Sequence, residues 1–141
     1  MAIDKIFGIA GSALNAQTTR MNTIASNLAN AGTVAGSEKD AFRAKRPVFK
    51  TVLEEQTQQR DLNFKGGVKV DQLTLDSSPV RRVADPGNPA ADKDGFVYLS
   101  NVNEMTEMVE MMAASRSYQN NVEVVNTARQ LMLRTLDITR S

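Results

Sequence analysis

The stretch Asn103–Leu136, NEMTEMVEMMAASRSYQNNVEVVNTARQLMLRTL, decides the fold class of this chain. Its apolar residues recur alternately three and four positions apart, which places them along one stripe of an α-helix. The stripe runs through Met108, Met111, Ser115, Tyr118, Val122, Val125, Arg129, Met132 and Leu136. We therefore expect one long helix with an apolar face that needs a packing partner.

The first thirty residues repeat this spacing. Their stripe consists of Ile3, Phe7, Ala10, Leu14, Gln17, Met21, Ile24, Leu28 and Ala31. Gln17, Ser115 and Arg129 interrupt the two stripes with polar groups, which can fix the register of paired helices at a cost in stability. We expect Gly32 to end the N-terminal helix by adopting the left-handed conformation.

The expected length of the C-terminal helix suggests what it packs against. About 34 helical residues rise by roughly 50 Å in total, whereas a compact globule of this size has a diameter of only about 37 Å. The helix should therefore project beyond any core that the chain forms alone. The candidate partners for its apolar face are the N-terminal helix and neighbouring copies of the chain.

Composition excludes several classes of function. The chain has 141 residues, 41% of them hydrophobic, a net charge of +1, and neither cysteine nor histidine. The commonest general base, the Cys nucleophile and the usual transition-metal ligands are therefore missing. We expect no catalytic residue, metal site or cofactor. No apolar run is long enough to span a bilayer, and the first residues lack the apolar core of a signal peptide, so we expect neither membrane insertion nor a cleaved signal.

Between the helices the sequence predicts a β-rich middle. We expect strands at 41–50 (interrupted by Pro47), 68–75 and 96–99, and 80–83 as a return strand after a turn at 77–79. Residues 33–39 should form a loop, 54–61 an exposed excursion and 85–89 a turn. Asn101 and Glu104 form a capping-box pattern that should start the long helix within a residue or two. The expected fold class is α+β, divided at 1–32, 33–100 and 101–141.

Three local patterns are better explained by structure than by ligand binding. Asp92–Gly95 resembles part of a calcium loop but lacks the carboxylates required at its two ends, so we interpret it as a turn. The basic residues of 43–50 have no interleaved aromatic platform, which favours a solvated or protein-contacting edge over nucleic-acid binding. The methionines at 105, 108, 111 and 112 are compatible with ordinary packing, but on a projecting helix they favour an adaptable interface.

Three motifs resemble a known family. The first is GSALNAQ at 11–17, followed by Arg20–Asn22 and by IASNLANA at 24–31. It resembles the N-terminal signature of the bacterial flagellar axial proteins of the rod and hook. The segments DPGNPAAD at 85–92, with Gly95–Val97, and ASRSYQNNVEV at 114–124 resemble the proximal-rod type within that family. Ala84 departs from the larger residue expected before the Asp-Pro turn, and 54–65 carries no motif of the family.

The resemblance implies a structural subunit without enzymatic activity. Its two terminal helices would pack as a coiled-coil-like helical layer of the basal-body rod, with the β-rich middle outside. Its partners would be copies of itself, other rod proteins and the flagellar type III export apparatus. The rod would cross the periplasm and transmit motor torque to the hook and filament.

The residues that we expect at the assembly interface follow from the stripes and the signature. They are Leu14, Met21, Ile24, Asn27, Leu28, Asn30, Met108, Met111, Tyr118, Val122, Val125, Met132 and Leu136. The amides of Asn27 and Asn30 can bond either orphan carbonyls at the helix end or the backbone of a neighbour.

Two functions of other classes stay open at this point. One is a self-contained homo-oligomeric coiled-coil adaptor, which would form a discrete small oligomer when purified. The other is a carboxylate-dependent hydrolase that uses Asp85, Asp92 and Asp94, which would show turnover dependent on a divalent metal.

Overall fold

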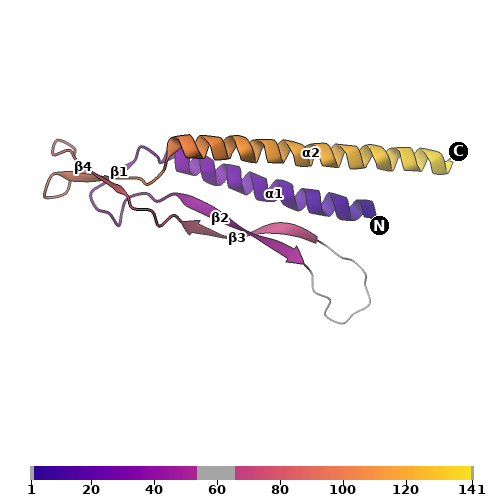
Figure 1. Ribbon diagram of the computed structural model, residues 1–141, viewed down its shortest axis with the longest axis horizontal. Helices are drawn as coiled ribbons and strands as arrows, with labels where there is room; N and C mark the ends of the chain where they lie inside the picture. Colours follow the sequence, from indigo (N-terminus) through magenta and orange to yellow (C-terminus); the bar gives the residue numbers. More distant parts are fainter. Residues whose placement is uncertain (1, 54–65, 141) are drawn as a thin grey trace.

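Two long antiparallel helices and two small antiparallel sheets make up the fold in the computed structural model, which describes residues 2–53 and 66–140. Helix α1 (Ala2–Ala29) and helix α2 (Glu104–Arg140) lie side by side, and both termini of the chain are at the same end (Figure 1). At about 1.5 Å per residue, α2 is roughly 55 Å long and α1 roughly 42 Å. The expected α+β class is confirmed.

Helix α1 ends in a tight turn rather than at a left-handed glycine. Asn30 N donates to the carbonyls of Ser26 and Asn27, and Ala31 N donates to Leu28 O. The Asn30 side chain also donates to Ser26 O at 2.8 Å. These bonds satisfy carbonyls that a helix end leaves without partners. The prediction of positive φ for Gly32 is wrong, because among the described glycines only Gly95 has positive φ, at 79°.

Helix α2 begins within the two residues that its predicted start allowed, but its N-cap is Asn103 rather than Asn101. The side chain of Asn103 accepts a hydrogen bond from Thr106 N at 3.1 Å, which is the geometry of an N-cap. Asn101 does not cap α2. Its Oδ1 accepts from Ala44 N at 2.7 Å, and its Nδ2 donates to Ser78 O at 2.9 Å. It therefore links Ala44 and Ser78 to the segment that leads into the helix.

Strands β2 (Lys45–Leu53) and β3 (Gly66–Leu75) form a two-stranded antiparallel sheet that contacts α1 (Figure 1). Pro47 lies inside β2, where it pairs with Leu73. The register shifts between Val48 and Phe49, which is the signature of a β-bulge. The expected excursion at 54–61 falls outside the residues that the structure describes, as does the side chain of Ile3.

A second sheet has the strand order β1–β5–β4 and lies at the end of the molecule opposite the termini (Figure 1). It consists of β1 (Val34–Ala35), β4 (Arg81–Ala84) and β5 (Phe96–Leu99), all antiparallel. Two expectations need correction here: the loop at 33–39 contains β1, and the return strand at 80–83 pairs with β5 rather than with the strand before it. The expected strand at 96–99 is confirmed.

The core is built mainly from small side chains. Ala31, Ala44 and Val102 form its buried cluster, with Phe42 packed against them. Ala10 and Ala16 of α1 and Ala114 and Ala128 of α2 are also buried. Small residues let two helix backbones approach closely, and among the described helix residues Ile24 of α1 is the one large apolar side chain in this buried set. No helix in the described parts of the chain combines the length and apolar character needed to cross a membrane.

Candidate assembly interface

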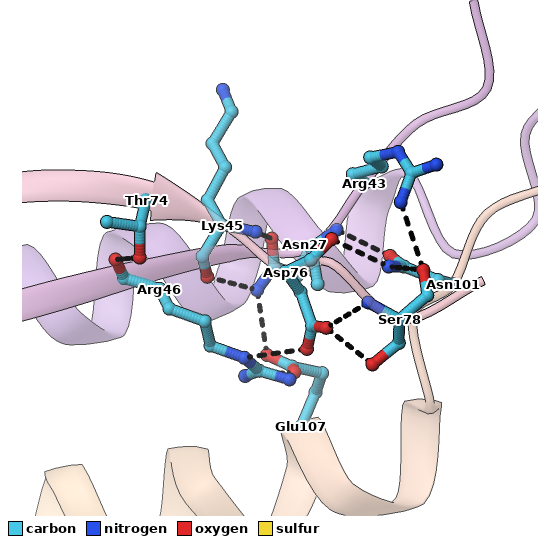
Figure 2. Close-up of polar contacts among 10 residues, drawn as sticks. Asn27, Arg43, Lys45, Arg46, Thr74, Asp76, Ser78, Asn101 and Glu107 are labelled. Carbon is cyan, nitrogen blue, oxygen red and sulfur yellow. Dashed lines mark hydrogen bonds and ion pairs between the residues drawn. The ribbon is translucent and has the colours of Figure 1, made fainter. Parts of the chain in front are cut away.

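Asn27 ties α1 to the start of β2 through the backbone of Lys45. Its Oδ1 accepts from Lys45 N at 2.8 Å, and its Nδ2 donates to Lys45 O at 3.0 Å (Figure 2). A second bond from Nδ2 reaches Glu107 Oε2 at 3.0 Å. The side chain is completely buried. One amide therefore joins α1, β2 and α2 in a region from which water is excluded.

Glu107 brings a carboxylate of α2 into the same junction. It is 0% exposed, and its Oε1 lies 2.5 Å from Arg46 Nη1 of β2, in an ion pair rather than an aligned hydrogen bond. A buried carboxylate is costly unless a partner balances its charge. Arg46 provides that charge, so the position of β2 and the docking of the first turns of α2 depend on each other.

Asp76 extends the junction to the end of β3. Its Oδ1 accepts from Ser78 N at 2.8 Å and from the Ser78 hydroxyl at 2.5 Å, and its Oδ2 lies 3.6 Å from Arg46 Nε (Figure 2). The hydrogen bonds from Ser78, helped by the charge of Arg46, lower the pKa of Asp76 below its ordinary value although partial burial opposes them. Together, Asn27, Arg46, Asp76 and Glu107 form what we call the polar junction.

Many residues of the two predicted stripes are buried or half-buried within the single chain. The predicted α1 stripe from Phe7 to Ala31 is buried or half-buried throughout. On α2 the positions buried or half-buried in three- and four-residue alternation are Glu107, Met111, Ala114, Tyr118, Asn121, Val125 and Ala128. Among the described elements, α1 is the one whose backbone packs closely against α2. Met111, Tyr118 and Val125 therefore pack within the single chain.

The other predicted α2 residues lie one position away from this contact or beyond it. Met108 and Val122 are exposed beside the buried position 107 and the half-buried position 121. Met132 and Leu136 belong to residues 129–139 of α2, all of which are exposed and which we call the overhang. In Figure 1 the C-terminal end of α2 extends past the start of α1. Assembly roles for these residues remain a proposal.

Two further apolar surfaces lie outside the helix contact. Met105, Met108, Val109 and Met112 are between 54% and 71% exposed, and we call them the methionine patch. Met112 is one residue, or about 100° of helix rotation, from the half-buried Met111. The second surface is a groove of about 420 Å³ in which Ile6 of α1 faces Val124 and Leu131 of α2. Both surfaces expose apolar side chains that a single chain leaves partly in water.

The polar junction was missed by the sequence analysis, apart from Asn27. Glu107 directly precedes Met108 of the predicted stripe. A carboxylate so close to an apolar face is the sequence feature that could have indicated the junction. Arg46 lies in β2 and Asp76 directly follows β3, two strands whose pairing the sequence left open. Pattern analysis cannot show that three segments so far apart in the chain meet.

The acidic cluster near Asp92 is a turn, as expected. Asp92 Oδ1 accepts from Asp94 N at 3.0 Å and from Phe96 N at 2.8 Å, so its lone pairs stabilise the backbone. Within residues 2–53 and 66–140, no group of three or more acidic side chains is placed to hold a metal ion.

Comparisons with known proteins agree with this architecture. The family described as "Flagella basal body rod protein" matches residues 7–35, and "Flagellar basal body rod FlgEFG protein C-terminal" matches residues 93–138. The flagellar basal-body rod protein FlgC of Salmonella typhimurium is 47% identical over 98% of both chains, and that of Escherichia coli O157:H7 is 48% identical over the same share. FlgC of Agrobacterium fabrum is 36% identical over 94% of this chain and 92% of its own length. These relatives are structural rod proteins rather than enzymes. The chain therefore belongs to the FlgC family of flagellar basal-body rod proteins.

Proposed function

We propose that this protein is a structural subunit of the proximal rod of the bacterial flagellar basal body, which polymerises through its terminal helices. The rod would cross the periplasm and carry motor torque to the hook and filament. Membership of the FlgC family supports the rod assignment. The observation that supports assembly through the helices is the exposed apolar overhang of α2, because Met132 and Leu136 would be covered only by a neighbouring subunit.

Burial of these surfaces provides the driving force for assembly. Each Å² of apolar surface removed from water contributes about 25 cal/mol, against the entropy lost when subunits associate. The contacts would be made with copies of the chain and with other rod proteins, in a coiled-coil-like helical layer. The predicted residues Leu14, Met21 and Leu28 are half-buried and Val122 is exposed, so a neighbour can reach part of each side chain.

We also infer that the chain reaches the rod through the flagellar type III export apparatus without a cleaved signal peptide. The family assignment supports this route. A chain with a core made largely of alanines buries little apolar surface for its length, which keeps the cost of unfolding for export low.

A matched pair of variants tests the proposed function. In a strain that lacks its own copy of the gene, Met132→Asp combined with Leu136→Asp should abolish motility and remove the chain from purified basal bodies. Gln130→Asp, also on the overhang and exposed, should be tolerated. Circular dichroism of the purified chains should show unchanged helix content in both. Normal rods with the double variant would contradict assembly through the overhang, and a discrete small oligomer of the wild-type chain would favour the coiled-coil adaptor instead.

A further inference from the structure

The two ends of α2 carry different apolar surfaces that α1 leaves uncovered. The methionine patch lies within the first three turns. At the other end, Met132, Leu133 and Leu136 are 41–53% exposed, and we call these three residues the overhang face. The surfaces are separated by about 36 Å along the helix. Because the two uncovered apolar faces lie at opposite ends of one helix, each can contact a different neighbour.

We propose that the overhang face of one copy of this chain docks on the methionine patch of a second copy, with the two α2 helices parallel and offset by about 36 Å. This inference rests on the proposed function, since it assigns partners to surfaces already argued to be assembly surfaces. The occupant of the methionine patch is therefore a defined segment of a second copy.

The spacing of the residues supports this pairing. Met108, Val109 and Met112 follow the intervals i, i+1 and i+4, and Met132, Leu133 and Leu136 repeat the same intervals. A single offset therefore places all three residues of one set at the height of their counterparts in the other set. The unbranched side chains of methionine are flexible enough to adapt their shape to branched leucine side chains.

Charge complementarity supports the same pairing. The methionine patch is bordered by Glu104, and residues 104–115 contain no lysine or arginine. The overhang carries Arg129, three residues before Met132. The same offset brings Glu104 within one residue of Arg129, whereas Glu110 takes no part because it pairs with Arg20 of α1. Opposite charges at the rim of an apolar contact favour this register over its alternatives.

The proposed contact joins two different surfaces, so it leaves one free patch and one free overhang at the ends of any open assembly. Such heterologous contacts extend into rings or open helices, whereas contacts of one surface with itself stop at a dimer. A tubular structure requires the first kind.

Cysteine crosslinking tests the contact cleanly because the natural chain contains no cysteine. A strain that lacks its own copy of the gene would produce two differently tagged chains, Met108→Cys and Met132→Cys, and purified basal bodies would be treated with a short bis-maleimide. We expect a covalent dimer carrying both tags. The control pairs Met108→Cys with Asn126→Cys, an exposed position of α2 outside both surfaces, and should give at least tenfold less of this dimer.

The outcomes separate the two proposals. Rods that contain both variants but yield no mixed dimer above the control would overturn the docking inference and leave the rod assignment intact. Dimers formed by either variant alone would mean that each surface meets itself, which also overturns it. Absence of the wild-type tagged chain from the rods would contradict the proposed function itself.

Charge reversal gives a second measurement that does not depend on cysteine. Glu104→Arg and Arg129→Glu should each reduce swimming motility severalfold, and the two changes in one chain should restore it, because each copy then presents both reversed charges. Failure of the double variant to exceed both single variants would overturn the inference.

Discussion

Asn27 pairs with Lys45 as a strand would, by bonding both the N–H and the C=O of its backbone, at 2.8 and 3.0 Å. A side chain of α1 thus occupies the place of a missing neighbour at the start of β2. Its third bond, to Glu107, makes the same amide the point where α2 is fixed. The relative positions of both helices and the β2–β3 sheet therefore depend on one residue.

The first prediction concerns the donor half of this amide. Asn27→Asp keeps the shape of the side chain but replaces the NH2 group with an oxygen that faces Glu107 and the Lys45 carbonyl. Loss of two buried bonds together with like-charge repulsion should lower the free energy of unfolding by about 3 kcal/mol or more. Urea denaturation measures it. Asn15→Asp, on the exposed side of α1, should stay within about 0.5 kcal/mol of wild type, and equal effects of the two would contradict the role of the junction.

A second prediction concerns the ion pair between Arg46 and Glu107. Arg46→Met leaves a completely buried carboxylate without its balancing charge and should cost about 3–5 kcal/mol. Adding Glu107→Gln removes the stranded charge, so the double variant should be more stable than Arg46→Met alone. A double-mutant cycle by chemical denaturation measures the coupling. Strictly additive effects would mean that the two side chains do not stabilise each other.

The third prediction contrasts two glycines. Gly95 has φ of 79°, and a Cβ there would lie 3.1 Å from Pro86 Cβ, so Gly95→Ala should destabilise the chain by roughly 1–2 kcal/mol. Gly32 lacks positive φ, and a Cβ would meet nothing within 4 Å, so Gly32→Ala should be neutral or stabilise slightly. Thermal unfolding of both variants measures the difference, and the reverse order would refute the backbone argument.

These glycines also show how far the sequence can predict the fold. The long segments with helical apolar spacing predicted both helices, because this spacing, repeated over many turns, is compatible only with a helix. Single-residue features failed where tertiary contacts compete with local preference. The hydrogen-bonded turn at Asn30 and Ala31 already ends α1, so Gly32 is not needed in the left-handed conformation. Asn101 has the sequence context of a cap, but its side chain bonds to Ala44 and Ser78 instead.

The register of the helix contact shows the same limit. Met111, Tyr118 and Val125 of the predicted stripe are half-buried in the single chain, but the contact positions that alternate with them are Glu107, Ala114 and Asn121. A search for apolar periodicity does not select a glutamate or an asparagine, so it cannot identify positions 107 and 121. The sequence therefore predicted the helices that build the candidate site but not the junction that orients them.

The fourth prediction follows from the lowered pKa of Asp76. A carboxyl whose pKa is lower in the folded than in the unfolded state stabilises the fold fully above its ordinary pKa of about 3.9. That contribution is lost as the pH falls below this value through the lowered folded pKa. Asp76→Asn should therefore reduce stability at pH 6 and differ less from wild type at pH 3. Denaturation at both pH values measures this, and a constant difference would show that ionisation of Asp76 is irrelevant.

The last prediction uses two adjacent valines of α2 that differ in what they contact. Val125 is half-buried in the contact with α1, whereas Val124 is 47% exposed and lines the groove with Ile6. A carboxylate at 125 must be desolvated against α1, so Val125→Asp should lower the melting temperature of the purified chain by several degrees and remove it from rods. Val124→Asp should leave the purified chain nearly as stable as wild type, because its carboxylate stays in water, yet it should also impair rod incorporation, because assembly would have to bury that charge. Circular dichroism melts and immunoblots of purified basal bodies measure the two effects. If Val124→Asp rods form normally, the groove is not an assembly surface; if Val125→Asp leaves the melting temperature unchanged, the contact between α1 and α2 does not stabilise the single chain.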